Sequence, residues 1–226
     1  MLVDMHDRDR TFADRSEAGR ELAARVLRLD LEAPVVLALP RGGVPVGFEI
    51  ARALQAPLDA LLVRKIGAPG HNEFALGAVV EGDPPIVVLN EDVPKRFLPH
   101  VHREAEREAA EIERRRQSLR GGRPLTALAG RTAIVVDDGI ATGATFRAAL
   151  KATKKLNAAK VIAAIPVAPA DSLRAIEDLA DHVVCLATPE PFYAVGLHYG
   201  DFTQTTDAEV VALLDTAKGF ANSKFD

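Results

Sequence analysis

Apolar and polar positions divide the chain into apolar runs of strand length and amphipathic segments with helical spacing. Runs that predict strands lie at 35–39, 58–65, 76–80, 86–89, 131–138, 160–168 and 182–187. Helical patterns lie between or beside them, at about 14–27, 44–55, 91–120, 143–156, 171–180 and after 206. Two of these helices start with a capping-box pattern, Asp14 with Glu17 and Thr206 with Glu209.

Strands and helices that alternate in this way predict an α/β fold with a mostly parallel central sheet flanked by helices. The central strands are apolar throughout, which is typical of a sheet covered on both faces. We expect a single domain over 1–226, with a helical insertion at about 91–120. Ligands of such sheets bind beyond the carboxyl ends of the strands, so the loops that start near 40, 64, 137, 166 and 187 are the candidates.

One of these loops carries the strongest chemical pattern, Ile134 to Thr145, with the sequence IVVDDGIATGAT. Two adjacent carboxylates at the end of a buried strand repel each other and resist leaving water. The glycines and threonines that follow offer backbone amides and hydroxyls beside a helix start, which together favour phosphate. Asp137 and Asp138 would accept hydrogen bonds from sugar hydroxyls, so a ribose 5′-phosphate fits. The alternative is a polar turn with Asp138 as a helix cap, which explains one aspartate but not two.

Composition narrows the class of protein. The net charge is −4 and the pI is about 5.9, so nucleic acid is not a favoured partner. A single cysteine, Cys185, excludes an internal disulfide and fits a reducing compartment. No apolar run approaches the roughly 20 residues that span a bilayer, and the charged N-terminus has no secretory pattern. We expect a cytoplasmic protein without a membrane partner.

The stretch 134–145 resembles the phosphoribosyl pyrophosphate (PRPP) signature of type I phosphoribosyltransferases. The resemblance implies that Asp137 and Asp138 bind the ribose hydroxyls. It also implies a 5′-phosphate site made by Gly139, Ala141, Thr142, Gly143, Ala144 and Thr145. Mg²⁺ would be the cofactor, held by the two aspartates indirectly, through water or ribose.

The same resemblance implies a site for the diphosphate leaving group. Arg41, Gly42 and Gly43 end the first strand and are similar to the family's diphosphate loop, where a cis peptide near Arg41–Gly42 is expected. Arg64 and Lys65 are placed to meet diphosphate charge, and the glycines and prolines that follow predict a mobile loop. Arg41, Lys65, Asp137 and Asp138 are therefore the candidate catalytic residues.

The family builds a hood over the acceptor base from its terminal segments, here about 1–30 and 188–226. Phe192 and Tyr193 are the candidates for stacking on the base, with His198, Tyr199 and Phe202 as weaker ones. Aromatics that anchor the C-terminal segment to the core are an equally good interpretation. The hood matches no known acceptor specificity.

The charged segment 95–120 has charges of both signs at i,i+4 spacing, such as Glu111 with Arg115, which predicts a solvated helix rather than a basic patch. The histidines have no metal-binding spacing.

The resemblance implies transfer of a phosphoribosyl group from PRPP to a nitrogenous, nucleobase-like acceptor with release of pyrophosphate. A non-catalytic PRPP- or nucleotide-binding regulator, and phosphoryl or phosphorolytic chemistry on a ribose phosphate, are the alternatives. The family's habit favours a homodimer.

Overall fold

The structure, a computed structural model, describes residues 10–69, 71–90 and 93–220, and for 71–74 the backbone only. Its helices are α1 (Arg15–Val26), α2 (Gly43–Leu54), α3 (Leu98–Arg120), α4 (Ala144–Lys155), α5 (Ala170–Glu177) and α6 (Asp207–Ala217), with 3-10 turns at Lys95–Phe97 and Val195–His198. Its strands are β1 (Val35–Ala38), β2 (Leu58–Ala60), β3 (Val63–Ala68), β4 (His71–Val80), β5 (Ile86–Leu89), β6 (Thr132–Val136), β7 (Lys160–Val167) and β8 (His182–Ala187). The ends of the predicted hood, 1–9 and 221–226, and residues 91–92 of the predicted insertion lie outside the described residues.

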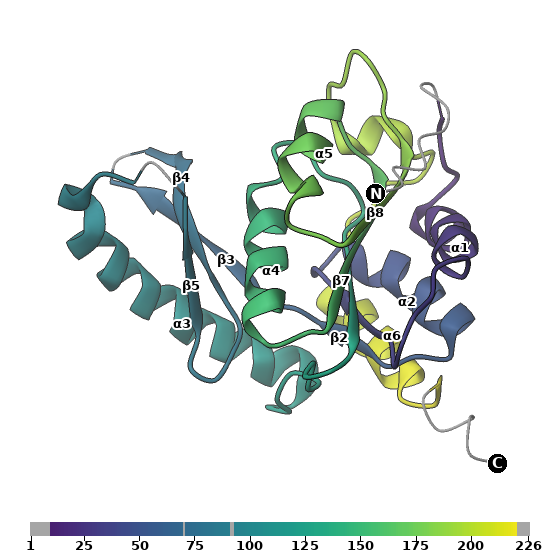
Figure 1. Cartoon of the computed structure of the whole chain (residues 1–226), viewed down its shortest axis with the longest axis horizontal. Coiled ribbons are helices and arrows are strands. Elements are labelled where there is room, and N and C mark those ends of the chain that lie inside the picture. The colour runs from purple at the N-terminus through teal and green to yellow at the C-terminus, as the bar shows by residue number, and fades with distance from the viewer. Residues whose placement is uncertain (1–9, 70, 91–92, 221–226) are drawn as a thin grey trace.

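Five strands form a parallel sheet in the order β2-β1-β6-β7-β8, which confirms the predicted α/β class (Figure 1). Side chains alternate between the two faces of each strand. Val36 of β1 and Ile134 of β6 face a core shared with α1, α2 and α6. Their neighbours Val35 and Val135 face a second core, shared with α4 and α5. Because helices cover both faces of the sheet, its central strands are apolar on both faces, as their sequences predicted.

The strand order reverses between β1 and β6. The chain moves from β1 to β2 on one side and from β6 through β7 to β8 on the other. Ala38 and Val136 are register partners near the ends of these two strands, so the loops that follow them start side by side. This reversal is the point at which open α/β sheets bind ligands. The fold therefore brings residues 40–43 and 137–145 together.

The other three strands form an antiparallel sheet, β3-β4-β5, which we call the arm (residues 63–89). The arm projects beside the parallel sheet, with α3 along one face and α4 along the other (Figure 1). The prediction of one strand over 58–65 is wrong, because the chain leaves the parallel sheet after Ala60 and starts β3 at Val63. The stretch after Lys65, predicted to be a mobile loop, is strand where the structure describes it, because residues 66–68 of β3 pair with β4; Gly70 of that stretch lies outside the described residues. The carboxyl end of β3 is thus not an edge of the central sheet.

The capping box predicted at Thr206 is present, because Thr206 and Glu209 bond each other reciprocally at the start of α6. At α1 only half of the predicted box forms: the Asp14 carboxylate accepts a hydrogen bond from Glu17 N at 2.7 Å, but the Glu17 carboxylate accepts from the amide of Ala13 instead of that of Asp14. The charged helix α3 is partly packed, because Val101, Ile112 and Leu119 are buried. Most of its ion pairs within the helix have i,i+3 spacing, in place of the predicted i,i+4 pairs. None of the helices in the described part of the chain is long and apolar enough to cross a membrane.

Candidate active site

The two adjacent aspartates lie directly after β6, at the reversal of the strand order. Asp137 Oδ1 accepts a hydrogen bond from the backbone N–H of Asp138 at 2.9 Å, so the first carboxylate turns back over its own backbone. The second carboxylate extends toward the N-terminal segment, where its side chain is 14% exposed. The pair therefore does not share one direction, and each acid meets a different environment.

Asp138 has a cationic partner that lies 123 residues away in the sequence. Arg15 Nε donates to Asp138 Oδ2 at 2.7 Å, and a second guanidinium nitrogen donates to the carbonyl of Thr203 at 2.8 Å. The guanidinium also lies over the ring of Phe202, 3.9 Å from its centroid, in a cation–π contact. Tyr199 donates from its hydroxyl to the carbonyl of Asp138 at 2.5 Å. The N-terminal helix and the segment 199–203 thus close over the aspartate from two sides.

Asp137 has the more perturbed acidity. Loss of solvent around its carboxyl raises its pKa well above the ordinary value of an aspartate, and the charge of Asp138 raises that pKa further. The hydrogen bond from the Asp138 amide and the positive charge of Arg15 act in the opposite direction and are weaker. A carboxyl of this kind holds a proton at pH values where an exposed aspartate has lost it. It can then donate a hydrogen bond as well as accept one.

Gly42 and Gly43 pack directly against the aspartates. A Cβ on Gly42 would lie 2.0 Å from Asp138 Oδ2, and a Cβ on Gly43 would lie 2.8 Å from the carbonyl oxygen of Val136. Any side chain at these positions would push the two loops apart. These glycines, predicted to contact the diphosphate, therefore also have a packing role. The cis peptide lies at Pro40–Arg41, one bond before the predicted position.

The segment 139–145 is an open turn that leads into α4. Gly143 is the N-cap residue of α4 and has the left-handed conformation, φ 68°, which glycine adopts without strain. Because glycine has no side chain, this helix start has no side-chain cap. The turn is held from outside by Arg147, which donates to the carbonyl of Thr142 at 2.8 Å, and by a hydrogen bond from Ser172 to the carbonyl of Ala141. The first amides of α4, which have no acceptor within the helix, follow this turn directly. This arrangement can bind an anion.

A cavity of about 480 Å³ adjoins the second aspartate. It is lined by Arg15, Arg41, Gly42, Asp138, Phe202, Gln204 and Thr205. The Arg41 guanidinium lies 3.9 Å from the carboxylate of Asp207, the first residue of α6, and its side chain is 33% exposed. The cavity therefore has a carboxylate, two guanidinium groups and one aromatic ring on its walls.

Arg64 and Lys65 do not join this cavity. As neighbours on β3 they point to opposite faces of the arm. Arg64 Nε donates to Glu108 of α3 at 2.8 Å, on the face away from α4. Lys65 lies beside Ala144 and Thr145, at the first turn of α4. The structure therefore places Lys65 next to the predicted 5′-phosphate loop and Arg64 apart from both predicted phosphate sites.

The predicted stacking residues lie outside the cavity. Phe192 stacks on His198, with ring centroids 5.8 Å apart, and the Tyr193 side chain is 78% exposed. Phe202, a weaker candidate in the sequence, is the aromatic residue on the cavity wall. Arg15 was not predicted as a site residue, because it lies within the capping pattern of a helix start, which explains its presence without a role in binding. No local signal in the sequence relates it to an acid so far along the chain.

The described residues contain no cluster of three or more acidic, histidine or cysteine side chains able to hold a metal ion. The aspartate pair alone can supply at most two carboxylates. Mg²⁺ keeps several waters and binds well through one or two carboxylates together with substrate phosphates. The residues present therefore fit a metal that arrives with a phosphorylated substrate, and the indirect role of Asp137 and Asp138 in holding it stays a prediction.

Comparison with known proteins agrees with this geometry. The family model described as "Phosphoribosyl transferase domain" matches residues 14–199. Two Mycobacterium tuberculosis proteins, from strains CDC 1551 / Oshkosh and H37Rv, are each 50% identical over 209 residues; they are named "Putative phosphoribosyl transferase MT0597" and "Putative phosphoribosyl transferase Rv0571c". The match covers 91% of this chain but 47% of either relative, so the chain spans about half the length of these curated relatives.

A solved structure matches almost the same share of this chain. The crystal structure of TT1426 from Thermus thermophilus is 44% identical, with a TM-score of 0.81. The match covers 90% of this chain and 97% of that one. The resemblance seen in the sequence is thereby confirmed: the chain belongs to the phosphoribosyl transferase domain family, a family of transferases.

Proposed function

We propose that this chain transfers the 5-phosphoribosyl group of PRPP to a nitrogenous, nucleobase-like acceptor and releases pyrophosphate. The observation that carries the proposal is the meeting of three parts at the reversal of the strand order. These are the acid pair 137–138, the open anion-binding turn 139–145 and the loop 41–43. A phosphorylated sugar with a second phosphate group at its other end matches this arrangement of charges.

The acid pair orients the sugar in this proposal. Asp138 accepts a hydrogen bond from one ribose hydroxyl, while Asp137, with its raised pKa, is able to donate as well as accept. The amides that open α4 bind the 5′-phosphate together with the helix dipole. Fixing both ends of the ribose holds its C1 atom at the mouth of the cavity, where an acceptor can approach. Such positioning accounts for a large part of the rate of a bimolecular reaction.

The diphosphate leaves against the loop 41–43. Arg41 provides a forked cation on the cavity wall, with Asp207 as its counter-charge in the absence of ligand. Mg²⁺, which the family generally uses, would be held by oxygens of the substrate with Asp137 and Asp138 in its outer shell, and supplies further neutralisation of the leaving group. Lys65 adds positive charge beside the first turn of α4. Phe202 and Arg15 form the part of the cavity wall that an acceptor base would contact.

A homodimer stays our prediction for the assembly.

The test of this proposal is the double variant Asp137→Asn with Asp138→Asn. We expect calorimetric binding of PRPP in the presence of Mg²⁺ to weaken by roughly 100-fold, because charged hydrogen bonds to the sugar are lost. The melting temperature should stay within a few degrees, since asparagine keeps the shape and a carbonyl oxygen for Arg15. Asp171→Asn, which changes an aspartate with an 87% exposed side chain, is the matched control. Unchanged affinity in the double variant would refute the assignment.

Turnover is tested separately. Wild-type protein incubated with PRPP, Mg²⁺ and a panel of nucleobases should release pyrophosphate with at least one of them. PRPP binding without release for any base would favour the alternative, a non-catalytic PRPP- or nucleotide-binding regulator.

A further inference from the structure

One arginine of the N-terminal helix is withdrawn from solvent. The side chain of Arg15, the first residue of α1, is 11% exposed, whereas that of Arg20 on the same helix is 53% exposed. A guanidinium that gives up most of its water is stable only when the fold supplies a counter-charge and hydrogen-bond acceptors. The partners of Arg15 therefore show what this side chain is placed to do.

Those partners fix the orientation of the guanidinium. Nε donates to Asp138 Oδ2 at 2.7 Å, and Nη1 donates to the carbonyl oxygen of Thr203 at 2.8 Å. The central carbon, Cζ, lies 3.9 Å from the centroid of the Phe202 ring. Because a guanidinium is planar and rigid, contacts at two of its nitrogens and at one face leave it a single orientation. The direction from which Arg15 reaches Asp138 is thus set by the segment 202–203.

The chain just before α1 is bonded to the same C-terminal region through its backbone. Phe12 donates to the carbonyl of His198 at 2.8 Å and accepts from the amide of Gly200 at 2.7 Å. The carbonyl of Ala13 accepts from the amide of Asp201 at 2.8 Å. The start of α1 is therefore held against this region without the arginine side chain, whose own bonds are free to serve another purpose.

Asp138 is held from several sides. Its Oδ2 atom, bound to Arg15, is also packed against Gly42, where a Cβ would lie 2.0 Å away. Its backbone carbonyl accepts from the hydroxyl of Tyr199 at 2.5 Å. Rotation of the carboxylate would break the bond to Arg15, while the main chain beneath it is fixed by the tyrosine. A ligand therefore meets this carboxylate in one orientation.

We propose that Arg15 is a positioning residue for the sugar, which sets the direction of the Asp138 carboxylate before ribose hydroxyls bind to it. This inference rests on the proposed function, in which Asp138 accepts a hydrogen bond from the ribose. A hydrogen bond weakens steeply as its angle departs from linear. A carboxylate that is already ordered also loses little side-chain freedom when the ligand binds. Arg15 itself does not bind the sugar, and its contribution passes through Asp138.

The test compares two ligands that differ in their hydroxyl groups. Ribose 5-phosphate has them, whereas tetrahydrofurfuryl phosphate has the same five-membered ring and phosphate arm without any hydroxyl on the ring. We expect wild-type protein to bind ribose 5-phosphate about tenfold more tightly in calorimetric titrations, and Arg15→Met to reduce this ratio by about fivefold. Because both ligands carry the same phosphate, a general loosening of the fold weakens both and leaves the ratio unchanged.

Two further variants separate positioning from other effects. Arg15→Lys keeps the charge, but its compact ammonium does not reproduce the planar fork that bonds Asp138 and Thr203 together. We expect it to recover only part of the ratio. Arg20→Met removes an exposed arginine from the same helix and is the matched control, for which the ratio should equal that of wild type.

The outcomes distinguish this inference from the proposed function. A wild-type ratio in either folded variant of Arg15 would overturn the inference and leave the assignment of Asp138 to the sugar intact. A ratio higher than that of wild type would overturn it as well, since Arg15 would then compete with the sugar for Asp138. If wild-type protein binds the two ligands equally, the acid pair does not bind the ribose, and the proposed function fails together with the inference.

Discussion

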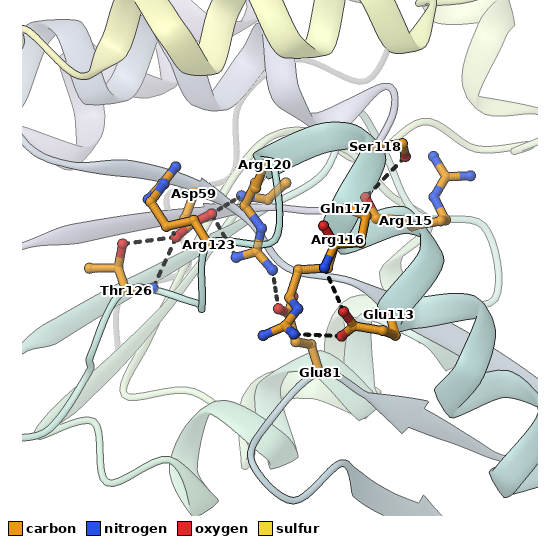
Figure 2. Close-up of polar contacts among 11 residues, drawn as sticks. Asp59, Glu81, Glu113, Arg115, Arg116, Gln117, Ser118, Arg120, Arg123 and Thr126 are labelled. Atoms are coloured by element: carbon orange, nitrogen blue, oxygen red, sulfur yellow. Dashed lines mark hydrogen bonds and ion pairs between the residues drawn. The ribbon is translucent and has the colours of Figure 1, made fainter.

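Two clusters in the structure each hold two carboxylates and a closely bound arginine, and they use them differently. In the cluster that follows β6, Arg15 pairs with Asp138 rather than with Asp137, beside an open turn and a cavity. In the cluster at the edge strand β2, Arg120 lies between Asp59 and Glu81 and has no exposed side-chain surface (Figure 2). The first cluster joins the N-terminal helix to the loop that follows β6. The second joins the parallel sheet, the arm and α3, so its arginine is part of the framework.

From the difference between the two clusters, we expect substitution of Arg120 to have the largest effect on stability. Replacing it with methionine leaves two buried acids without the cation between them, which should lower the free energy of unfolding by about 3–5 kcal/mol in urea titrations. Arg114→Met is the matched control, since that side chain is 66% exposed on the same helix, and we expect a change within about 0.5 kcal/mol. Equal effects of the two substitutions would show that the buried cluster does not hold the framework together.

A smaller effect, on binding as well as on stability, is expected from Gly42→Ala. The new methyl group would lie 2.0 Å from Asp138 Oδ2, so the loop or the carboxylate has to shift. Overpacking of this kind costs about 1–3 kcal/mol, and we expect PRPP affinity measured by calorimetry to fall by about tenfold. Gly219→Ala serves as control, because its nearest contact, 3.6 Å from the Thr216 carbonyl oxygen, is ordinary. Unaltered affinity in Gly42→Ala would mean that the two loops are not set by this contact.

The smallest effect is a change in the pH dependence of stability. Asp137 has a raised pKa in the folded protein, so its stabilising contribution is complete below the ordinary aspartate value of 3.8 and is lost as the pH rises through the folded pKa. Asp137→Asn has no such loss. Its free energy of unfolding relative to wild type should therefore increase as the pH rises above 3.8 in chemical denaturation.

Glu81→Gln should change the pH profile in the same direction, because burial raises the pKa of Glu81 as well. The attraction of Arg120 opposes that rise, so the change should be smaller than at Asp137. Parallel profiles of wild type and Asp137→Asn would contradict the picture of a desolvated carboxyl at that position.

The sequence revealed the parts of the first cluster that are contiguous in the chain. Asp137 and Asp138 are neighbours and end an apolar run, so their placement followed from the pattern alone. The second cluster joins positions 59, 81 and 120, and no local pattern relates residues so far apart. Arg15 escaped prediction for the same reason. Such pairings depend on tertiary packing, which a single sequence records only indirectly.

The start of the arm was mispredicted for a different reason, although the strands at 76–80 and 86–89 were predicted. The run 58–65 is apolar up to Val63, apart from Asp59, and Leu61 and Leu62, between β2 and β3, are both buried. Since burial continues while the chain changes sheets, no turn signal marks the break. The helices were located more reliably, because the capping residues Asp14 and Thr206 define where α1 and α6 begin.

The position of Asp207 affects how well the chain would tolerate deletions or fusions on its C-terminal side. It is the first residue of α6 and lies 3.9 Å from Arg41 and 3.3 Å from Arg115 of α3. A deletion that begins upstream of this helix, or a fused domain that unwinds its first turn, would remove the negative partner of both arginines at once. Damage there would reach the loop 41–43 without any change to the loop's own residues.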